Sequence, residues 1–319
     1  MRADPRWRGG DAAYSVALAD GRVLWLFGDS FVGEGDGTEG RGGRAMVRNT
    51  VALQSGANPA TSSFSFAHRT TDTGEPSPFF APMFGLDLWP GPASRIGDGL
   101  LLTFVRIRST EADLGFETVD SLAFRVPDTA GMPAAWTFEP TELPAAPPGV
   151  QLGYGAHLAD PRWTYAFAPV EPGNHDIYLG RWAADDLTAG HTERMQWWSG
   201  SAWQAEPSQA RVIVGGLQTE FSVTRVGEEL WMVSTDTFGA SDIVVRTAAA
   251  PEGPWSPPRQ LYRPPEFGRD GVLIYSAKAH AHLEGGPQVL TYCTNRLDFW
   301  DLAADMDVYF PRFVRVTPR

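Results

Sequence analysis

The stretch that decides the fold is AAYSVALADGRVLWLFGDS, residues 12–30, in which two apolar strands are joined by a short turn containing Asp and Gly. Gly and Asp readily adopt the positive φ that tight hairpins need. The same pattern occurs five times, roughly every 60–80 residues as in a repeat architecture. The five turns centre on Asp20, Asp98, Pro161, Glu228 and Gly285. The chain is therefore predicted to consist of repeated β-hairpins.

A third strand follows each hairpin and opens with Asp or Asn, at Asn49, Asp120, Asp176, Asp242 and Asp307. A tryptophan then introduces a fourth, edge strand in three repeats, at Trp136, Trp203 and Trp255. Four strands repeated in this way are typical of β-propeller blades. We predict an all-β, five-bladed propeller with four-stranded blades that fills residues 1–319 as one domain. Two β-sandwiches are the alternative, since they also use short alternating strands.

The last repeat ends at its third strand, residues 308–316, and leaves no sequence for a fourth. The N-terminal segment DPRWRGG, residues 4–10, carries a matching tryptophan, Trp7. We therefore expect this segment to supply the missing edge strand and close the ring.

Composition excludes several classes of protein. Asp and Glu number 38 against 26 Lys and Arg, a formal charge of −12, which argues against nucleic-acid and anionic-membrane partners. The single cysteine, Cys293, excludes an internal disulfide and a Cys-rich zinc site. The first residues lack the apolar region of a signal peptide, so we expect a cytoplasmic monomer. The alternative is a secreted protein whose leader has been removed.

Propeller geometry predicts where the chemistry lies. The start of each first strand, the end of each second strand and the start of each third strand meet at one mouth of the central channel. Acidic candidates for catalysis at this mouth are Asp11, Asp29 and Glu220. Candidates for substrate binding are Asn49, Asp87, Trp89, Arg106, Tyr154, Asp236, Lys278, His280, Asn295 and Arg312.

An acidic mouth with aromatic residues favours sugar chemistry. Cleavage of a glycosidic bond requires two carboxyl groups, one protonated and one ionised, and clustered acids raise the pKa of one of them. Asp11 opens the first strand and Asp29 ends its partner, so they are expected to face one another. We expect Asp11 to be the general base or nucleophile and either Asp29 or Glu220 to be the proton donor. A structural Gly-Asp turn at Asp29 and a strand-end cap at Glu220 are the alternatives.

Several other features have a structural interpretation. The Asp or Asn that opens every third strand is expected to cap backbone amides. His280 and His282 point to the same face and are expected to be packing residues, with His280 nearer the substrate. The alternative is that they bind a metal ion in the channel, since imidazole is a common metal ligand. The spacing of candidate ligands does not support a calcium or sodium ion in the channel, so we expect no metal or cofactor. Residues 33–43, rich in glycine, are predicted to form a mobile loop at the mouth.

Lys278 is the only lysine in the chain. It opens the fifth inner strand, where a compact ammonium can approach a sugar hydroxyl or a neighbouring acid in ways that a planar guanidinium cannot. The alternative is the chance survival of one lysine in an arginine-rich chain.

Both ends of the chain resemble a known family. GGDAAYSVALADGRVLWLFGDSFVG (residues 9–33) followed by MVRNTVALQ (46–54) resembles the opening blade of bacterial five-bladed propellers that include endo-D-arabinanases. YSAKAHAHL (275–283), VLTYCTN (289–295) and DMDVYFPRFVRV (305–316) are similar to their closing blade. The resemblance implies acid-catalysed hydrolysis of furanosidic bonds, with Asp11 and Asp29 at the matching positions.

We therefore hypothesise a glycoside hydrolase that cleaves furanosidic linkages of the D-arabinan type in a carbohydrate substrate. A lyase or cyclase that uses the same acids is one alternative, because fold alone does not define the reaction. A carbohydrate-binding propeller is another. The candidate residues differ from blade to blade, which favours one asymmetric site over repeated lectin sites.

Overall fold

The computed structural model describes residues 1–2, 4–33, 40–41, 44–111 and 115–317. Within these ranges the regular structure is almost entirely β, and the α-helices are α1 (Ala184–Ala189) and α2 (Phe299–Ala304), of six residues each. No helix in the described ranges is long and apolar enough to span a membrane. The predicted all-β class is confirmed.

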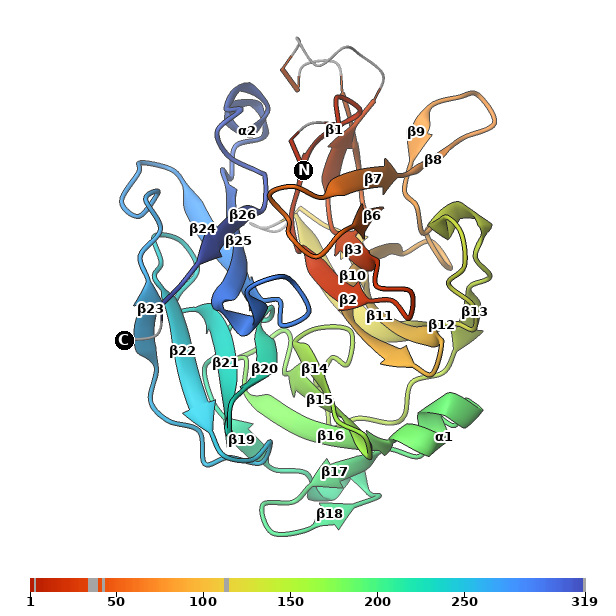
Figure 1. The fold of residues 1–319 in the computed structure, drawn as a ribbon, viewed down its shortest axis with the longest axis vertical. Coiled ribbons are helices and arrows are strands. Elements are labelled where there is room, and N and C mark those ends of the chain that lie inside the picture. Colours follow the sequence, from red (N-terminus) through yellow and green to blue (C-terminus); the bar gives the residue numbers. More distant parts are fainter. Residues whose placement is uncertain (3, 34–39, 42–43, 112–114, 318–319) are drawn as a thin grey trace.

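Five antiparallel sheets follow one another along the chain and lie around a common centre (Figure 1). The first contains β2 (Tyr14–Ala17), β3 (Val23–Phe27), β6 (Thr50–Ser55) and β7 (Ser63–Ala67). The second contains β10 (Asp87–Ile96), β11 (Gly99–Ser109), β12 (Phe116–Val126) and β13 (Glu139–Thr141). The third contains β14 (Ala156–Ala159), β15 (Trp163–Pro169), β16 (Ile177–Ala183), β17 (Gln196–Trp198) and β18 (Trp203–Gln204), with β19 (Val212–Val214) also paired to β16.

The fourth sheet contains β20 (Ser222–Val226), β21 (Glu229–Thr235), β22 (Ile243–Ala248) and β23 (Arg259–Tyr262). The fifth contains β24 (Leu273–Ala279), β25 (Val289–Asn295) and β26 (Arg312–Arg315). Two smaller sheets are formed by β1 (Trp7–Gly10), β4 (Ser30–Val32) and β5 (Ala45–Val47), and by β8 (Arg69–Thr70) with β9 (Pro76–Ser77).

The first strands of successive sheets are neighbours in space. β2 contacts β10, β10 contacts β14, β14 contacts β20, and β20 contacts β24. β24 returns to the first sheet through side chains, since Ser15 Oγ lies 2.6 Å from His280 Nδ1 and Lys278 Nζ donates to the carbonyl of Ala12 at 2.7 Å. The first strand of every sheet therefore lies next to the centre, where the predicted mouth residues begin.

The five hairpins occur where the repeat pattern predicts them, because each predicted turn lies between the first two strands of a sheet. The edge strands differ in one case. β13 and β23 follow Trp136 and Trp255 as fourth strands, whereas Trp203 lies in the fifth strand of its sheet. β17 precedes it there and takes the fourth position.

The predicted closure by residues 4–10 is wrong, because β1 pairs with β4 and not with β26. The indole of Trp7 determines this placement. It donates to Thr50 Oγ1 at 3.1 Å and stacks on Phe66 at a centroid distance of 4.4 Å, so it is buried against the first sheet. In the described ranges the fifth sheet has three strands.

The recurring Asp or Asn before each third strand has a different partner in different sheets. Asn49 accepts a hydrogen bond from the backbone N–H of Phe80 at 2.7 Å. Asp120 instead accepts from Arg106, and Asp242 is likewise held by a guanidinium. Asn49 thus caps a backbone amide, but that of Phe80, which lies outside the turn. The prediction is wrong for these two aspartates, because an arginine within reach is a stronger donor to a carboxylate than an amide.

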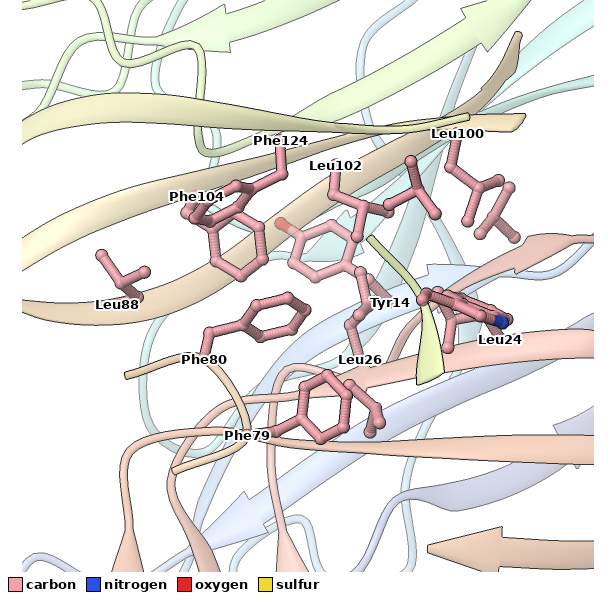
Figure 2. Close-up of a cluster of buried hydrophobic side chains, with 14 of the residues drawn as sticks. Tyr14, Leu24, Leu26, Phe79, Phe80, Leu88, Leu100, Leu102, Phe104 and Phe124 are labelled. Atoms are coloured by element: carbon pink, nitrogen blue, oxygen red, sulfur yellow. The ribbon is translucent and has the colours of Figure 1, made fainter. Parts of the chain in front are cut away.

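Apolar side chains fill the space between adjacent sheets. Figure 2 shows the cluster between the first two sheets, formed by Tyr14, Leu24, Leu26, Phe79, Phe80, Leu88, Leu100, Leu102, Phe104 and Phe124. Full burial of a large apolar side chain contributes roughly 1.5–3 kcal/mol. This packing fixes the first sheet against the second.

A buried arginine ties the start of the chain to its end. Arg41 is 1% exposed and donates to the carbonyls of Arg8, Leu302, Asp305 and Val308 at 2.5–2.8 Å. The backbone N–H of Gly10 also donates to the carbonyl of Tyr309 at 2.9 Å. These contacts connect the two chain ends without a shared sheet.

Arg41→Gln is expected to destabilise the protein by roughly 3 kcal/mol or more, because several buried carbonyls lose their donor together. The free energy of unfolding from denaturant titration measures the change. Arg225→Gln, at an exposed position, is the matched control and should leave stability within about 0.5 kcal/mol of wild type. Equal stability of the two variants would contradict a closing role for Arg41.

Candidate active site

The predicted catalytic acids line one cavity of about 560 Å³ near the centre of the sheets. Six of the predicted site residues contribute to its wall: Asp11, Asp29, Trp89, Tyr154, Glu220 and Asn295. Residues absent from the predicted site also line it, among them Arg48, Phe116, Phe238, Tyr275, Phe299 and Tyr309. The cavity therefore combines acidic groups with aromatic walls.

Asp11 directly follows β1, lies three residues before the start of β2, and is part of the cavity wall. Its Oδ2 accepts hydrogen bonds from the hydroxyls of Tyr275 at 2.7 Å and Tyr309 at 3.4 Å. Burial, together with the negative charges of Asp29 and Glu220, raises the pKa of Asp11 to about 8. Asp11 is therefore a carboxyl that retains its proton at neutral pH.

A glycine allows the approach of Asp11 to the end of β3. A Cβ atom on Gly28 would lie 2.5 Å from Asp11 Oδ1, closer than non-bonded atoms allow. The N–H of Gly28 also donates to the Asp11 carbonyl at 3.2 Å. Because Asp29 is the next residue, this close approach brings the two predicted acids to one wall of the cavity.

Asp29 has donors on both of its carboxylate oxygens. Trp89 Nε1 donates to Oδ1 at 2.7 Å and Arg48 Nη1 donates to Oδ2 at 2.9 Å. Arg48 is oriented in turn by Asp87, which accepts from its Nε at 3.1 Å. Burial raises the pKa of Asp29 overall, and the Arg48 charge and the Trp89 hydrogen bond offset part of that rise. These donors stabilise the ionised form of Asp29.

Glu220 is held by the only lysine. Its Oε2 accepts from Lys278 Nζ at 2.6 Å and from Ser276 Oγ at 2.5 Å. Lys278 is 2% exposed, and its Nζ also donates to the carbonyl of Ala12 at 2.7 Å and lies 4.2 Å from the ring centroid of Tyr14. An ammonium suits this place because its donors diverge from a single atom, whereas those of a guanidinium lie in one plane.

Seven predicted substrate-binding residues do not line this cavity: Asn49, Asp87, Arg106, Asp236, Lys278, His280 and Arg312. Asp87 and Lys278 act on the cavity through Arg48 and Glu220, which line it. Asn49 is fully buried and holds backbone groups, and Arg312 Nε lies 3.3 Å from Glu266. Arg106 is paired with Asp120 in a separate hollow of about 690 Å³. Asp236 is exposed just beyond the end of β21.

His280 lies away from the cavity that contains Asp11 and Asp29, in the wall of a second hollow. It follows Lys278 by two residues in the direction of the hairpin turn, and its ring contacts Ser15 and Thr291 at 2.6 and 2.7 Å. Burial lowers the pKa of both His280 and His282. In the part of the chain that the structure describes, no group of three His, Cys, Asp or Glu side chains is placed to hold a metal ion.

The predicted loop of residues 33–43 falls mostly outside the described residues. The predicted site lacked the side chains that hold the two acids, namely Tyr275 and Tyr309 on Asp11 and Arg48 on Asp29. Tyr275 and Tyr309 both lie within the C-terminal motifs, at 275–283 and 305–316, so the motifs contained the signal, although no single spacing pointed to the tyrosines.

One family of protein domains and several solved structures are similar to this chain. A family model described as a domain of unknown function (DUF5005) matches residues 1–318. No curated protein matches the chain. A solved structure from Bacteroides ovatus ATCC 8483, named a "putative hydrolase", is similar with a TM-score of 0.76 and 19% identity over 97% of this chain and 86% of that one.

Two further solved structures are glycoside hydrolases by name. The endo-arabinase of Bacteroides thetaiotaomicron VPI-5482 has a TM-score of 0.54 and 14% identity over 98% of this chain and 95% of that one. A glycoside hydrolase family 43 arabinoxylan arabinofuranohydrolase from Bacillus subtilis has a TM-score of 0.58 and 14% identity, over 98% of this chain and 64% of that one. At these identities the similarity concerns the fold.

The raised pKa of Asp11 predicts how stability depends on pH. The folded protein keeps a proton on Asp11 up to pH about 8, whereas the unfolded chain releases it near pH 4. The contribution of Asp11 to stability is therefore largest below pH 4 and is lost as the pH rises from about 4 to about 8.

Asp11→Asn should remove this component, so the stability of the variant relative to wild type should increase with pH across that window. Melting temperatures at several pH values between 5 and 9 measure it. Asp72→Asn, in an exposed turn, is the control. A constant difference between wild type and Asp11→Asn at all pH values would contradict the assignment.

Proposed function

We propose that this chain, which belongs to the DUF5005 domain family, is a glycoside hydrolase. Its reacting carboxyls are those of Asp11 and Asp29. The observation that carries the proposal is the contrast between these two groups in one cavity. Asp11 retains its proton, with a pKa of about 8, while Asp29 has charged and polar donors on both oxygens. Glycoside hydrolysis requires one protonated and one ionised carboxyl.

The roles follow from the protonation states. Asp11 gives its proton to the leaving glycosidic oxygen as the bond from that oxygen to the anomeric carbon breaks. Asp29 provides the negative charge, either attacking the anomeric carbon or taking a proton from the water that attacks it. This division reverses the sequence-based expectation, which made Asp11 the base, because burial and neighbouring negative charges favour the neutral form of Asp11.

Glu220 supports this arrangement as a third carboxyl. The buried ammonium of Lys278 pairs with its carboxylate at 2.6 Å, a charge-assisted hydrogen bond. Its negative charge adds to that of Asp29 in raising the pKa of Asp11. Glu220 thus helps to keep the proton on Asp11. Proton transfer between carboxyls and substrate needs no metal or cofactor, so the proposal includes none.

We also propose that the architecture is one five-bladed propeller and that the substrate is a furanoside of the D-arabinan type. The five sheets around a common centre support the blade number. The resemblance of residues 9–33 and the two fold neighbours named for arabinose-containing substrates support the sugar. Trp89 and Tyr154 add apolar surfaces against which a sugar ring can pack.

Two alternatives differ in measurable ways. A lyase or cyclase would use the same acids but would not incorporate solvent oxygen into its product. A lectin-like propeller would bind several sugars per chain, whereas the cavity residues here differ from sheet to sheet.

Asp11→Asn and Asp29→Asn should each reduce kcat on D-arabinan by at least about 10²–10⁴-fold, the contribution of one general acid or base. Release of reducing ends measures the rate, and product formed in oxygen-18 water distinguishes hydrolysis from elimination. Asp72→Asn again serves as the control. Full activity in either site variant would refute the proposed pair.

The protonation of Asp11 predicts an alkaline limit to activity. Since Asp11 acts as the proton donor and its pKa is raised to about 8, kcat/KM should fall roughly tenfold per pH unit above that value. A pH–rate profile on wild type tests this. Activity that continues to rise through pH 9 would show that Asp11 does not act as the acid.

A further inference from the structure

Large exposed hydrophobic side chains gather at one side of the cavity. Phe238, Leu297 and Phe299 line it and are 53%, 70% and 45% exposed, and Trp300 next to them is 77% exposed. A contiguous exposed apolar surface beside a site commonly marks a place where a ligand binds. An exposed apolar surface therefore lies beside Asp11 and Asp29. The acid–base reaction proposed for these two residues does not require such a surface.

A row of aromatic rings connects this surface to the reacting acid. Tyr309, whose hydroxyl contacts Asp11, lies 5.7 Å from Phe31 between ring centroids. Phe31 lies 5.9 Å from Phe299, and Phe299 lies 5.4 Å from Trp300 in an edge-to-face arrangement. The inner rings of the row are buried and the outer two are exposed. The buried rings of Tyr309 and Phe31 thus hold the exposed rings of Phe299 and Trp300 in place.

The helix that carries the exposed pair is anchored at both ends. Asp298 accepts from the N–H groups of Trp300 and Asp301 at 2.9 and 2.8 Å. At the other end Asp305 is paired with Arg296 at 2.9 Å and with Arg269 at 2.8 Å. α2 thus presents its exposed rings on a fixed support, which reduces the ordering cost of binding.

The opposite flank of the acids also has an aromatic wall. Trp89 and Phe116, from the second sheet, both line the cavity with ring centroids 4.4 Å apart. Asp11 and Asp29 lie beside the ends of β2 and β3 in the first sheet, and this sheet has the second sheet and the fifth as its neighbours. A ligand longer than one sugar would therefore meet aromatic rings on both sides of the acids.

We propose that Phe299 and Trp300, here called the α2 platform, bind sugar residues of a carbohydrate chain that extends out of the cavity. This rests on the proposed function and deepens it by assigning a chain rather than a small glycoside as substrate. Sugar rings present C–H faces that pack on aromatic rings, while Asn295 and Gln218 in the same wall can bind hydroxyls. The net charge of −12 disfavours an anionic lipid surface as the occupant.

The kinetic test compares a polysaccharide with a small substrate. Trp300→Ala should lower kcat/KM on D-arabinan about 2- to 10-fold, the range expected for loss of one aromatic contact, through KM and not kcat. Hydrolysis of an aryl furanoside that occupies only the cavity should stay within twofold of wild type. Trp300→Phe should recover most of the loss. Phe84→Ala, which removes a ring that is 89% exposed beside the other hollow, is the control.

A binding test separates the platform from the proposed reaction. In native gels containing D-arabinan, L-arabinan, xylan or galactan, wild type should be retarded by at least one polysaccharide, and Trp300→Ala less so. Retardation without any hydrolysis would refute the hydrolase but support the platform. Equal retardation of wild type and Trp300→Ala, or none by any of the four, would overturn the platform. So would a Trp300→Ala change from dimer to monomer in size-exclusion chromatography, which would assign the surface to a second copy of the chain.

Discussion

The ammonium of Lys278 joins three of the five sheets at the centre of the molecule. Lys278 lies in β24. Its ammonium donates to the carbonyl of Ala12, which precedes β2, and pairs with Glu220, which precedes β20. A buried ammonium is stable only when it is paired and hydrogen-bonded, so these partners must stay where they are. The positions of Ala12 and Glu220 are thereby fixed relative to each other, and Asp11 is held beside them. The placement of Glu220 and Asp11 in the cavity depends on these contacts of Lys278.

The cavity concentrates negative charge at a cost to stability. Four carboxyl groups line a partly enclosed space, those of Asp11, Asp29, Glu171 and Glu220. Asp29 pairs with Arg48, Glu220 with Lys278 and Glu171 with His175. Asp11 has tyrosine hydroxyls instead, and a hydroxyl compensates a buried charge less well than a cation does. The lowest-energy arrangement therefore leaves a proton on Asp11. Proteins commonly accept such local destabilisation where it provides a reactive group.

How much the sequence predicted can be seen from particular residues. The hairpin repeat placed Asp11 and Asp29 beside the same end of two adjacent strands, β2 and β3, and the pairing of these strands makes them neighbours. The same repeat also placed His280 and Arg312 near the mouth, yet His280 lies towards the opposite end and Arg312 is directed to Glu266. A strand position defines which end of a sheet a residue occupies only to within a few residues. Side-chain direction and local partners decide the rest.

The sequence by itself determined the all-β class, the five hairpins and the closeness of Asp11 to Asp29, because these depend on local turn chemistry and on a period that repeats along the chain. Only the tertiary structure decided which acid holds the proton, since that depends on burial and on partners 264 residues away such as Tyr275. It also decided that Trp7 packs on the first sheet and that α2 presents Trp300 beside the cavity. Such contacts join residues whose separation in sequence carries no periodic signal, so no pattern along the chain records them.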